Sequence, residues 1–454
     1  MKTILFDMVQ AIGHMNASFE IAGKLQAAGN RVVYIGGKQF SSVVLNKGFE
    51  YIIANNSLIL SDNNEFKLKG FVFYIECFIS LFTKARQQMF YKSVSDFEIL
   101  IKQIAPDFII LDIQLSMKAI IYHHLKIPYA CIETMPLSLY DPWIPPFTST
   151  IIPAKTPFSK VCISFAWQKI VWQRKLRHKM FALLLSGQDY YSLFRKLAKE
   201  FRFPYREKLN LKSSFVVNFK DIIILSMTSP CFDFPRKYQP KCYYAESRVD
   251  LDREKEIANK RYLMIMEKIQ SQKKHNPDIR LIYCSLGTVT QGFNKPLGVF
   301  FRKIKKISER NPGYIFILSV GMDYDASCLL PVPHNMYIFQ RIPQLHMLSQ
   351  SDMMITHGGM NSIAECIRMQ VPMLVCPLSR YWDQPGNSAR VVYHEIGLRA
   401  NIRRNSHKQI ERKIIKIISE HARYKQNLSH MNKKMVVENK ITHSWWNLFQ
   451  FNNK

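Results

Sequence analysis

The sequence of 454 residues lacks several patterns that would assign a protein class directly. Its nine cysteines are scattered and form no CxxC pair, which is unlike the ligand spacing of zinc sites and unlike a disulfide framework. No GxGxxG fingerprint is present, so nicotinamide chemistry is not expected. The sequence also carries no RNA-binding motif, and we expect no nucleic-acid partner.

Long apolar runs are also missing. The most apolar segment, FVFYIECFISLF from Phe71 to Phe82, has about half of the ~20 residues that a spanning helix needs, and Glu76 interrupts it. The N-terminus MKTILFDMVQAIG contains Asp7 and no small-residue cleavage site, so it predicts a first core strand and not a signal peptide. We therefore expect no transmembrane helix and a reduced, cytoplasmic protein.

Acidic side chains are few: 34 Asp and Glu stand against 63 Lys and Arg, which gives a formal net charge of +29. Three kinds of partner carry the complementary charge, namely nucleic acid, an anionic membrane surface and a phosphorylated ligand. Charge alone does not choose among them. With 47% hydrophobic residues the chain can bury ample core, and its length favours two domains.

Short apolar strands alternate with amphipathic helices along the chain, which predicts an α/β protein with doubly wound parallel sheets. In the first half, the expected strands cover residues 3–9, 31–37, 108–113, 128–134 and 221–227. In the second half, they cover residues 281–287, 314–320, 335–340, 353–356 and 372–378. The pattern predicts two Rossmann-like domains that face each other across a cleft, with ligands at the carboxyl ends of the strands.

A proline-rich stretch, SPCFDFPRKYQP at residues 229–240, interrupts this alternation and is followed by a charged stretch. These features place a linker near residues 244–252. The predicted N-terminal domain covers residues 1–243, and the predicted second domain covers residues 244–425. The basic segment 426–454 is predicted to form a C-terminal helix that crosses back to the N-terminal domain.

The stretch ITHGGMNSIAE, residues 355–365, joins a predicted strand to a predicted helix. Its glycines let a ligand approach the backbone, and the helix N-terminus offers unpaired amides and partial positive charge. Asn361 and Ser362 add donors, and Glu365 can accept hydrogen bonds from ribose hydroxyls one turn further on. The stretch is a candidate phosphate site, although an ordinary strand–helix turn with an N-cap would look similar.

The neighbouring motifs favour the phosphate site. FQRIPQ precedes the junction at residues 339–344, and VPMLVCPLSRYWDQPGNSARV follows it at residues 371–391. This ordered set resembles the donor-binding signature of the family 1 UDP-sugar-dependent glycosyltransferases, of the bacterial macrolide and natural-product type. The matching residues are Pro343, Gln344, Thr356, His357, Gly359, Asn361, Ser362, Glu365, Val371, Pro372, Met373, Pro377, Asp383, Gln384 and Asn387.

The resemblance implies a GT-B fold, in which the N-terminal domain binds the acceptor and the C-terminal domain binds the nucleotide sugar. It implies a donor site made of Ser285, Thr288, Ile342, Gln344, His357, Gly359, Asn361, Ser362, Glu365, Trp382, Asp383 and Gln384. In that site His357, Asn361 and Ser362 would hold the diphosphate. Glu365 would bind the ribose, with Gln344 beside it.

The resemblance also assigns the sugar end of the donor. Asp383 and Gln384 would bind the sugar hydroxyls, and Trp382 would line the sugar pocket beside them. Ser285 and Thr288, in the loop CSLGT, would touch phosphate or sugar. In this family the glutamine favours glucose, so a hexose, and glucose in particular, is the expected sugar.

Three positions depart from the family pattern. The backbone of Ile342 would meet the uracil, but Arg341 stands where plant members usually have a stacking Trp. A guanidinium can also stack, so the choice between UDP and TDP stays open. Gln370 replaces the glycine before Val-Pro-Met, at a turn, and Ser388 separates Asn387 from the alanine that follows it directly in the family.

The loop GHMN, residues 13–16, follows the first predicted strand and opens the first helix. In the family a loop of this kind carries the catalytic base, so the resemblance makes His14 the predicted base; a helix N-cap histidine is the alternative. A base needs a partner that fixes its tautomer. Asp112 ends the strand FIILD at the carboxyl edge of the same sheet, whereas Asp107 precedes that strand, so Asp112 is the predicted partner.

The implied reaction is an inverting transfer of a hexose from a UDP-sugar to a hydroxyl of a small apolar or lipid-like acceptor. The helix N-terminus and His357 would stabilise the leaving diphosphate, so neither a metal nor a cofactor is expected. Metal-dependent glycosyltransferases use an Asp-x-Asp pair instead. The pairs Asp250/Asp252 and Asp323/Asp325 occur in polar surroundings, and we interpret them as solvated surface.

The acceptor site is expected in the N-terminal domain, where aromatic residues are frequent. Phe73, Phe78, Tyr140, Trp143 and Phe147 are candidates for an apolar acceptor pocket, and ordinary core aromatics are the alternative for each. The segment 165–185 mixes aromatic with basic residues. It is expected to be a helix packed on its own domain with a solvated basic face; the alternative is a helix that lies on the inner membrane surface.

Two other functions stay open at this point. One is a non-catalytic basic protein that binds a membrane surface or nucleic acid, which would bind in a strongly salt-dependent way and ignore UDP. The other is a different two-Rossmann sugar-nucleotide enzyme, such as an epimerase. The predicted His14–Asp112 pair and the Asp383–Gln384 pair argue against the epimerase.

Overall fold

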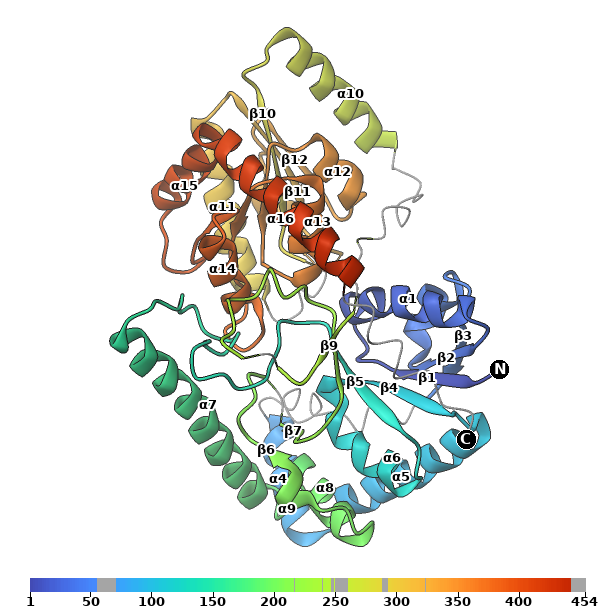
Figure 1. Ribbon diagram of the computed structural model, residues 1–454. Coiled ribbons are helices and arrows are strands. Elements are labelled where there is room, and N and C mark those ends of the chain that lie inside the picture. Colours follow the sequence, from blue (N-terminus) through green and yellow to red (C-terminus); the bar gives the residue numbers. More distant parts are fainter. Residues whose placement is uncertain are drawn as a thin grey trace.

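The structure is a computed structural model, and it describes residues 1–54, 71–215, 217–238, 240–245, 249, 260–287, 293–322 and 324–441. Within these ranges the chain forms two parallel sheets, each with helices on both faces (Figure 1). The first sheet occupies the lower half of Figure 1 and the second the upper half. The predicted α/β architecture of two doubly wound domains is confirmed.

The first sheet has the strand order β3-β2-β1-β4-β5-β8-β9, and its pairs are parallel. Its strands are β1 (Thr3–Asp7), β2 (Arg31–Gly36), β3 (Glu50–Ile53), β4 (Phe108–Asp112), β5 (Tyr129–Glu133), β8 (Ile224–Ser226) and β9 (Tyr243–Tyr244). Ile4 and Phe6 of β1 belong to one apolar cluster, and Leu5 belongs to the cluster on the opposite face. A strand buried on both faces needs no polar alternation, which explains its continuous apolar run.

Helices cover both faces of this sheet. The described helices of this domain are α1 (Ile12–Ala27), η1 (Lys38–Phe40), α2 (Ser41–Leu45), α4 (Phe71–Phe82), α5 (Ala85–Ile104), η3 (Ile113–Lys118), α6 (Ala119–His124), α7 (Pro157–Leu184), α8 (Tyr190–Glu200) and α9 (Tyr205–Lys208). A short antiparallel pair, β6 (Leu209–Asn210) and β7 (Asn218–Phe219), lies beside α9. Helix α7 runs along the outer edge of the domain, away from the sheet (Figure 1).

The second sheet has the order β12-β11-β10-β13-β14-β15 and is parallel throughout. Its strands are β10 (Arg280–Ser285), β11 (Tyr314–Ser319), β12 (Met336–Phe339), β13 (Met353–Thr356), β14 (Met373–Val375) and β15 (Gly397–Arg399). Its helices are α10 (Lys260–His275), α11 (Asn294–Arg310), η5 (Ala326–Leu329), α12 (Gln344–Gln350), α13 (Met360–Met369), α14 (Gln384–Tyr393), α15 (His407–Ser419) and α16 (His421–Ile441). The sheet therefore carries the predicted donor motifs at the carboxyl ends of its strands.

Helix α16 joins the second domain to the first. It runs without a break from His421 to Ile441, so it passes through the predicted boundary at 425/426. Its residues Leu428 and Met431 pack in the core beside α13, and Met435 reaches residues of the N-terminal domain. The predicted domain boundaries stay predictions.

No helix in the described part of the chain is long and apolar enough to cross a membrane.

Candidate active site

His14 and Asp112 meet at the carboxyl edge of the first sheet. His14 lies in the first turn of α1, which begins directly after the loop that follows β1. Asp112 is the last residue of β4, the strand that pairs with β1. The Nδ1 atom of His14 lies 2.7 Å from Oδ2 of Asp112. By contrast, Asp107 accepts a hydrogen bond from the amide of Thr3 at the opposite edge of the sheet.

The carboxylate of Asp112 is buried and held in place by backbone donors. Its Oδ1 accepts from the amide of Gln114 at 3.0 Å and its Oδ2 from the amide of Val9 at 3.4 Å. Burial lowers the pKa of His14, but the charge and hydrogen bond of Asp112, with the charge of Asp383, outweigh burial, and the net shift is upward. The arrangement fixes the ring through Nδ1 and leaves Nε2 to exchange a proton.

Two polar side chains outside the predicted site also contact the imidazole of His14. Oγ1 of Thr134 lies 3.1 Å from Nδ1, and Nε2 of Gln114 lies 3.2 Å from Nε2 of His14. Thr134 directly follows β5, so the strand-end argument that selects Asp112 also points to it. Gln114 lies near the ring only because the chain turns into η3 after β4, which the sequence pattern does not reveal.

The donor motif forms the predicted strand–turn–helix junction. Strand β13 ends at Thr356, Gly358 has a φ of +89°, and Gly359 is the N-cap of α13. The first intrahelical bond runs from the amide of Ile363 to the carbonyl of Gly359. The amides of residues 360–362 therefore precede that bond and point out of the helix N-terminus, where an anion is stabilised.

His357 lies against this N-terminus, between two glycines. A Cβ atom at Gly287 would lie 2.7 Å from its imidazole, and one at Gly359 would lie 2.6 Å from it. Its buried Nδ1 has no hydrogen-bond partner among the described residues. Burial lowers the pKa of His357 to about 4, so near neutral pH the ring is uncharged and offers an N–H donor.

The predicted ribose residues also come together. The side-chain amide of Gln344 donates to the buried carboxylate of Glu365 and lies 3.4 Å from Oγ of Ser362. Its Oε1 accepts from the hydroxyl of Tyr283 at 3.2 Å. Glu365 thus presents its carboxylate beside the helix N-terminus. Ile342 is buried next to this group.

The predicted sugar residues form a second buried cluster around the start of α14. Nδ2 of Asn387 donates to Oδ2 of Asp383 at 2.7 Å and to the carbonyl of Gly358 at 2.8 Å, so the cluster is tied to the phosphate turn. Oε1 of Gln384 accepts from two backbone amides, those of Leu378 and Ser379. The amide nitrogen of Gln384 thus remains as a donor. Separately, the ring of Trp382 packs edge-on against that of Phe293 at 6.0 Å.

The two domains bring these groups into contact. Nδ2 of Asn361 donates to the carbonyl of Gly13 at 3.2 Å, one residue before His14. The charge of Asp383 acts on the pKa of His14, and that of His14 on the pKa of Asp383. The site therefore places a carboxylate-bound histidine from one domain against the N-terminus of helix α13 from the other.

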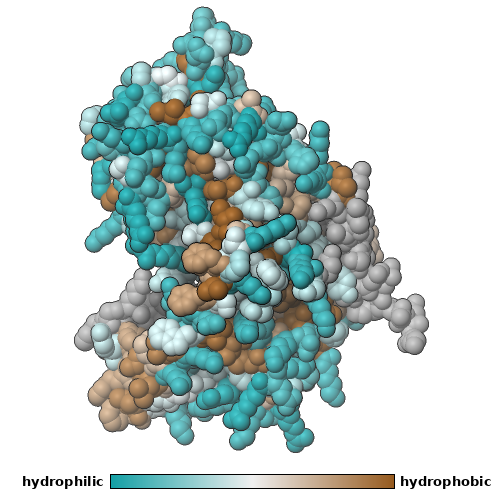
Figure 2. Space-filling view, turned by 60° about the vertical axis from the view of Figure 1, so that its left-hand side comes forward, coloured by the Kyte–Doolittle hydropathy of each residue, from teal (hydrophilic) through white to brown (hydrophobic). Residues whose placement is uncertain are grey.

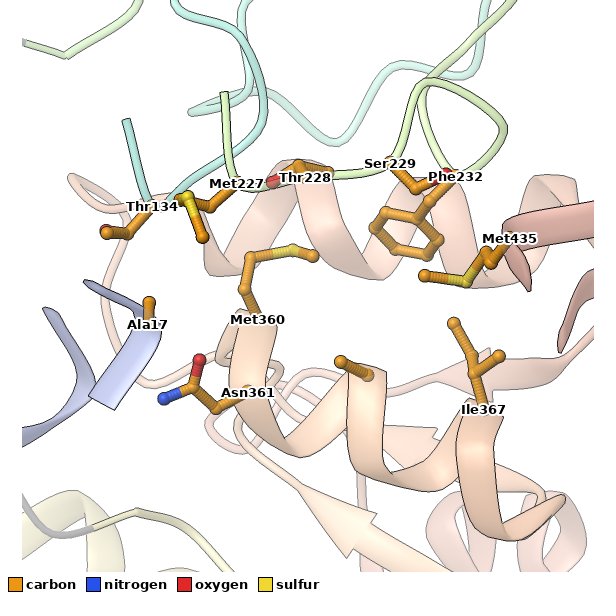
Figure 3. A pocket seen from close by; sticks show the side chains of 11 residues that line it. Ala17, Thr134, Met227, Thr228, Ser229, Phe232, Met360, Asn361, Ile367 and Met435 are labelled. Atoms are coloured by element: carbon orange, nitrogen blue, oxygen red, sulfur yellow. The ribbon is translucent and has the colours of Figure 1, made fainter. Parts of the chain in front are cut away.

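Behind this contact lies a small cavity of about 20 Å³ between the domains, roughly the size of one water molecule. Figure 3 shows Met360 rising from α13 toward the segment that carries Met227 and Thr228. Ala17 of α1 and Met435 of α16 close it from either side. A cavity of this size and apolar lining serves packing between the domains and is too small for a substrate.

Comparisons with known proteins agree with this geometry. Residues 331–439 match the family described as UDP-glucoronosyl and UDP-glucosyl transferase. The predicted resemblance to the family 1 glycosyltransferases, of the bacterial natural-product type, is confirmed.

Curated relatives of this chain include two bacterial proteins. Zeaxanthin glucosyltransferase of Pantoea ananas is 33% identical over 190 residues, which are 42% of this chain and 40% of that protein. The NDP-glycosyltransferase YjiC of Bacillus subtilis is 23% identical over 396 residues, which are 86% of this chain and 82% of that protein. The more similar alignment thus spans less than half of the relative's length.

Solved structures show the same fold. The glycosyltransferase of kitacinnamycin superposes with a TM-score of 0.63 at 17% identity and covers 96% of this chain and 95% of its own. The calicheamicin glycosyltransferase CalG4 superposes with a TM-score of 0.63 at 15% identity, covering 97% of this chain and 95% of its own. The predicted GT-B fold of this chain is thereby confirmed.

The remaining predicted residues are distributed as follows. Ser285 is buried at the end of β10, and Thr288 lies outside the described residues.

Of the Asp-x-Asp pairs, Asp325 is described; it caps η5 by accepting from the amide of Ser327 at 2.9 Å. No cluster of His, Cys, Asp or Glu in the described ranges has the composition of a metal site. Arg341 is exposed next to the predicted nucleotide position.

The five predicted acceptor residues lie in three places. Phe147 is fully buried, and its carbonyl accepts from the amide of Gly386 in α14 at 2.7 Å. Tyr140 and Trp143 are partly exposed, toward α7 and its neighbouring lysines. The remaining two, Phe73 and Phe78, lie on α4. The structure therefore does not gather all five into one pocket.

Proposed function

We propose that this glycosyltransferase transfers a hexose from a UDP-sugar to a hydroxyl of a small apolar or lipid-like acceptor, with inversion and without a metal ion. One observation carries the proposal: His14, bound through Nδ1 to a buried carboxylate, lies against the anion-binding turn of α13 through the Asn361–Gly13 contact. A base and a site for the departing anion are thus adjacent, which is what direct displacement at a sugar carbon requires.

In the proposed reaction Nε2 of His14 takes the proton of the acceptor hydroxyl as its oxygen forms a bond to the anomeric carbon. Asp112 stabilises the imidazolium that results, because its carboxylate is bonded to Nδ1. The side-chain amide nitrogen of Gln114, 3.2 Å from Nε2 of His14, supplies a hydrogen-bonding neighbour for that hydroxyl. General-base assistance of this type contributes roughly 100- to 10,000-fold to the rate.

The bond from the anomeric carbon to the diphosphate oxygen breaks at the same time, and UDP leaves with the electron pair on the opposite face. The amides of residues 360–362 and the neutral imidazole of His357 would stabilise the charge that develops on the diphosphate. This is the function that a metal ion serves in metal-dependent enzymes, so we propose no metal and no cofactor. Inversion follows from the single displacement.

Glucose is the proposed sugar because of how Gln384 is held. Its carbonyl oxygen is committed to two backbone amides, which fixes the direction of its NH₂ group. Asp383, held by Asn387, offers an acceptor beside it. A donor and an acceptor at fixed positions suit adjacent equatorial hydroxyls. For localisation, we propose a cytoplasmic protein.

Thermal stabilisation tests the donor half of this proposal. The purified protein is heated with UDP, and with UDP- and TDP-sugars, in the presence of a chelator. A ligand at about 100 times its Kd adds about 2.7 kcal/mol to the free energy of unfolding, which gives a readily measured shift. Stabilisation by UDP with the chelator present supports the donor site, and absence of any shift would overturn it.

Product analysis tests the catalytic half. The sugar that stabilises best is incubated with a panel of apolar alcohols and phenols, and the anomeric configuration of the product is read by NMR. His14→Ala should abolish transfer and retain stabilisation by UDP. Retained transfer would remove His14 from the mechanism, and conversion of the UDP-sugar into another UDP-sugar without an acceptor would indicate an epimerase.

A further inference from the structure

Helix α7 has two opposite faces of different character. Its inner face is fixed to the domain through Ile163, Trp167 and Arg174, which are buried. Nε1 of Trp167 donates to the carbonyl of Ile144 at 2.9 Å, and Arg174 donates to three backbone carbonyls of residues 211–215. These contacts set the orientation of the helix. They leave its opposite face exposed to solvent.

The outer face of α7 carries an apolar stripe in addition to the expected exposed basic side chains. Its exposed apolar side chains are Phe158, Val161, Phe165, Trp172, Leu176, Met180 and Leu183. Their spacing of three, four or seven residues puts them on one stripe of the helix. Phe158 and Leu183, at the two ends, are 78% and 79% exposed, so the stripe is solvent-exposed over the length of the helix.

Helix α4 extends this surface. The ring of Phe73 packs edge-on against that of Phe181 of α7 at 6.2 Å, which places the two helices side by side. The exposed apolar side chains of α4 are Tyr74, Ile75, Phe78, Ile79, Leu81 and Phe82. Figure 2 shows hydrophobic side chains gathered at the lower left of the molecule, at the level of α4 in Figure 1. We call the outer surface of both helices the α4–α7 face.

The exposed charged side chains of α7 on this face are basic. Helix α7 contains no Asp or Glu, and Lys169, Lys175 and Lys179 are exposed within or beside its apolar stripe. The acidic residue of α4, Glu76, forms an ion pair with Arg86 at 3.1 Å. An exposed apolar stripe of this length marks an interaction surface. Its lysines select a partner that is both apolar and anionic.

We propose that the α4–α7 face docks on a lipid bilayer that contains anionic lipids, with α7 parallel to the membrane plane. Aromatic and aliphatic side chains enter the boundary between headgroups and acyl chains, and lysines contact the anionic headgroups. A second copy of the chain fits less well, because the same lysines and a net charge of +29 would repel each other across such an interface.

A groove of about 260 Å³ opens on the same helix and connects this surface to the rest of the domain. It is lined by Tyr140, Trp167, Trp172, Lys175 and Lys212, among others. Trp172 belongs both to the groove and to the exposed stripe. If the acceptor is lipid-like, as proposed above, the docked bilayer becomes its source; this last step rests on the proposed function, whereas docking itself does not.

Vesicle flotation with the full chain tests the docking. Binding is compared on vesicles of phosphatidylcholine alone and on vesicles that also contain phosphatidylglycerol, at low and high salt. We expect binding to the anionic vesicles that weakens with salt. Replacing Lys169 and Lys179 by Gln should weaken it by about five-fold for each lysine. Equal binding to neutral and anionic vesicles would overturn the proposal.

Matched substitutions separate the apolar contribution. Phe165→Asp and Leu183→Asp change exposed side chains of the stripe, and Met264→Asp, on α10 of the other domain, changes one that is 69% exposed. The first two should lose vesicle binding, and Met264→Asp should retain it, with unchanged melting temperatures in all three. Equal loss in all three would refute the proposal. So would a dimer, detected by light scattering, that the stripe variants abolish.

The result of the vesicle-binding experiments does not depend on catalysis. Docking is measured without a nucleotide sugar, and His14→Ala should bind vesicles as well as the parent protein. Phe165→Asp should retain transfer to a water-soluble acceptor. Loss of docking with retained UDP stabilisation would therefore refute the membrane surface alone, and absence of UDP stabilisation with retained docking would refute the proposed function alone.

Discussion

The side-chain amide of Asn361 donates a hydrogen bond to the backbone carbonyl of Gly13 at 3.2 Å. Asn361 belongs to the turn that is predicted to hold the diphosphate, and Gly13 precedes the predicted base. A Cβ atom at Gly13 would lie 3.7 Å from this amide, so the first turns of α1 and α13 approach each other closely. We therefore expect this one side chain to couple donor binding to the position of the predicted base.

Removal of this amide should weaken the donor site without unfolding the protein. For Asn361→Ala we expect UDP to bind roughly 10- to 150-fold more weakly, since a hydrogen bond to a charged group is worth ~1.5–3 kcal/mol. Isothermal titration with UDP measures the change. Asn427→Ala is the matched control, because Asn427 also donates one hydrogen bond to a backbone carbonyl, that of Glu395. Unchanged affinity in Asn361→Ala would remove Asn361 from the site.

The pH dependence of transfer should report the His14–Asp112 pair. The pKa of His14 is shifted upward from 6.5, and only the neutral ring can accept a proton, so kcat/KM should rise with pH through a midpoint above 6.5. In Asp112→Asn the charge that raises the pKa is absent, so the midpoint should move to lower pH and kcat should fall by roughly 100-fold or more. A midpoint that stays in place would contradict the pairing.

The sequence identifies most of this site because its residues follow strand ends. Asp112 and the turn of residues 357–359 each follow an apolar strand, and parallel strands end at one edge. Thr134 also follows a strand end directly, so the same rule points to it although it is absent from the predicted site. Gln114 does not obey it, since its position depends on the path of η3. The exposure of the α7 stripe could not be predicted either, because an apolar stripe predicts a buried face equally well.

Glu133 should make the protein less stable as the pH rises. It is fully buried in β5, next to Thr134; its Oε1 accepts from the amide of Ser138, and its Oε2 has no partner among the described residues. Burial raises the pKa of Glu133 to about 8. Between its unfolded pKa near 4.5 and this value the native state binds more protons than the unfolded state, so the free energy of unfolding falls as pH rises.

Glu133→Gln should remove this dependence, because glutamine keeps the acceptor for Ser138 and cannot ionise. We expect the variant to be more stable than the parent at pH 8 by about 1–3 kcal/mol, with a difference that shrinks toward pH 5. Urea unfolding at several pH values measures it. Glu207→Gln, at an exposed carboxyl, is the control and should show no such trend. A difference that grows toward low pH would have the wrong sign.

Gln370 offers a stability test at the position where the chain departs from the family glycine. It is the C-cap of α13 with a φ of +57°, in the left-handed region that side chains other than glycine adopt at a cost of roughly 1–2 kcal/mol. Gln370→Gly should therefore raise the free energy of unfolding by about 1 kcal/mol. Met369→Gly, one residue earlier and still helical, should lower it by about as much. Thermal unfolding of the two variants should give melting temperatures on opposite sides of the parent's, and a loss of stability in both would show that the left-handed turn carries no strain.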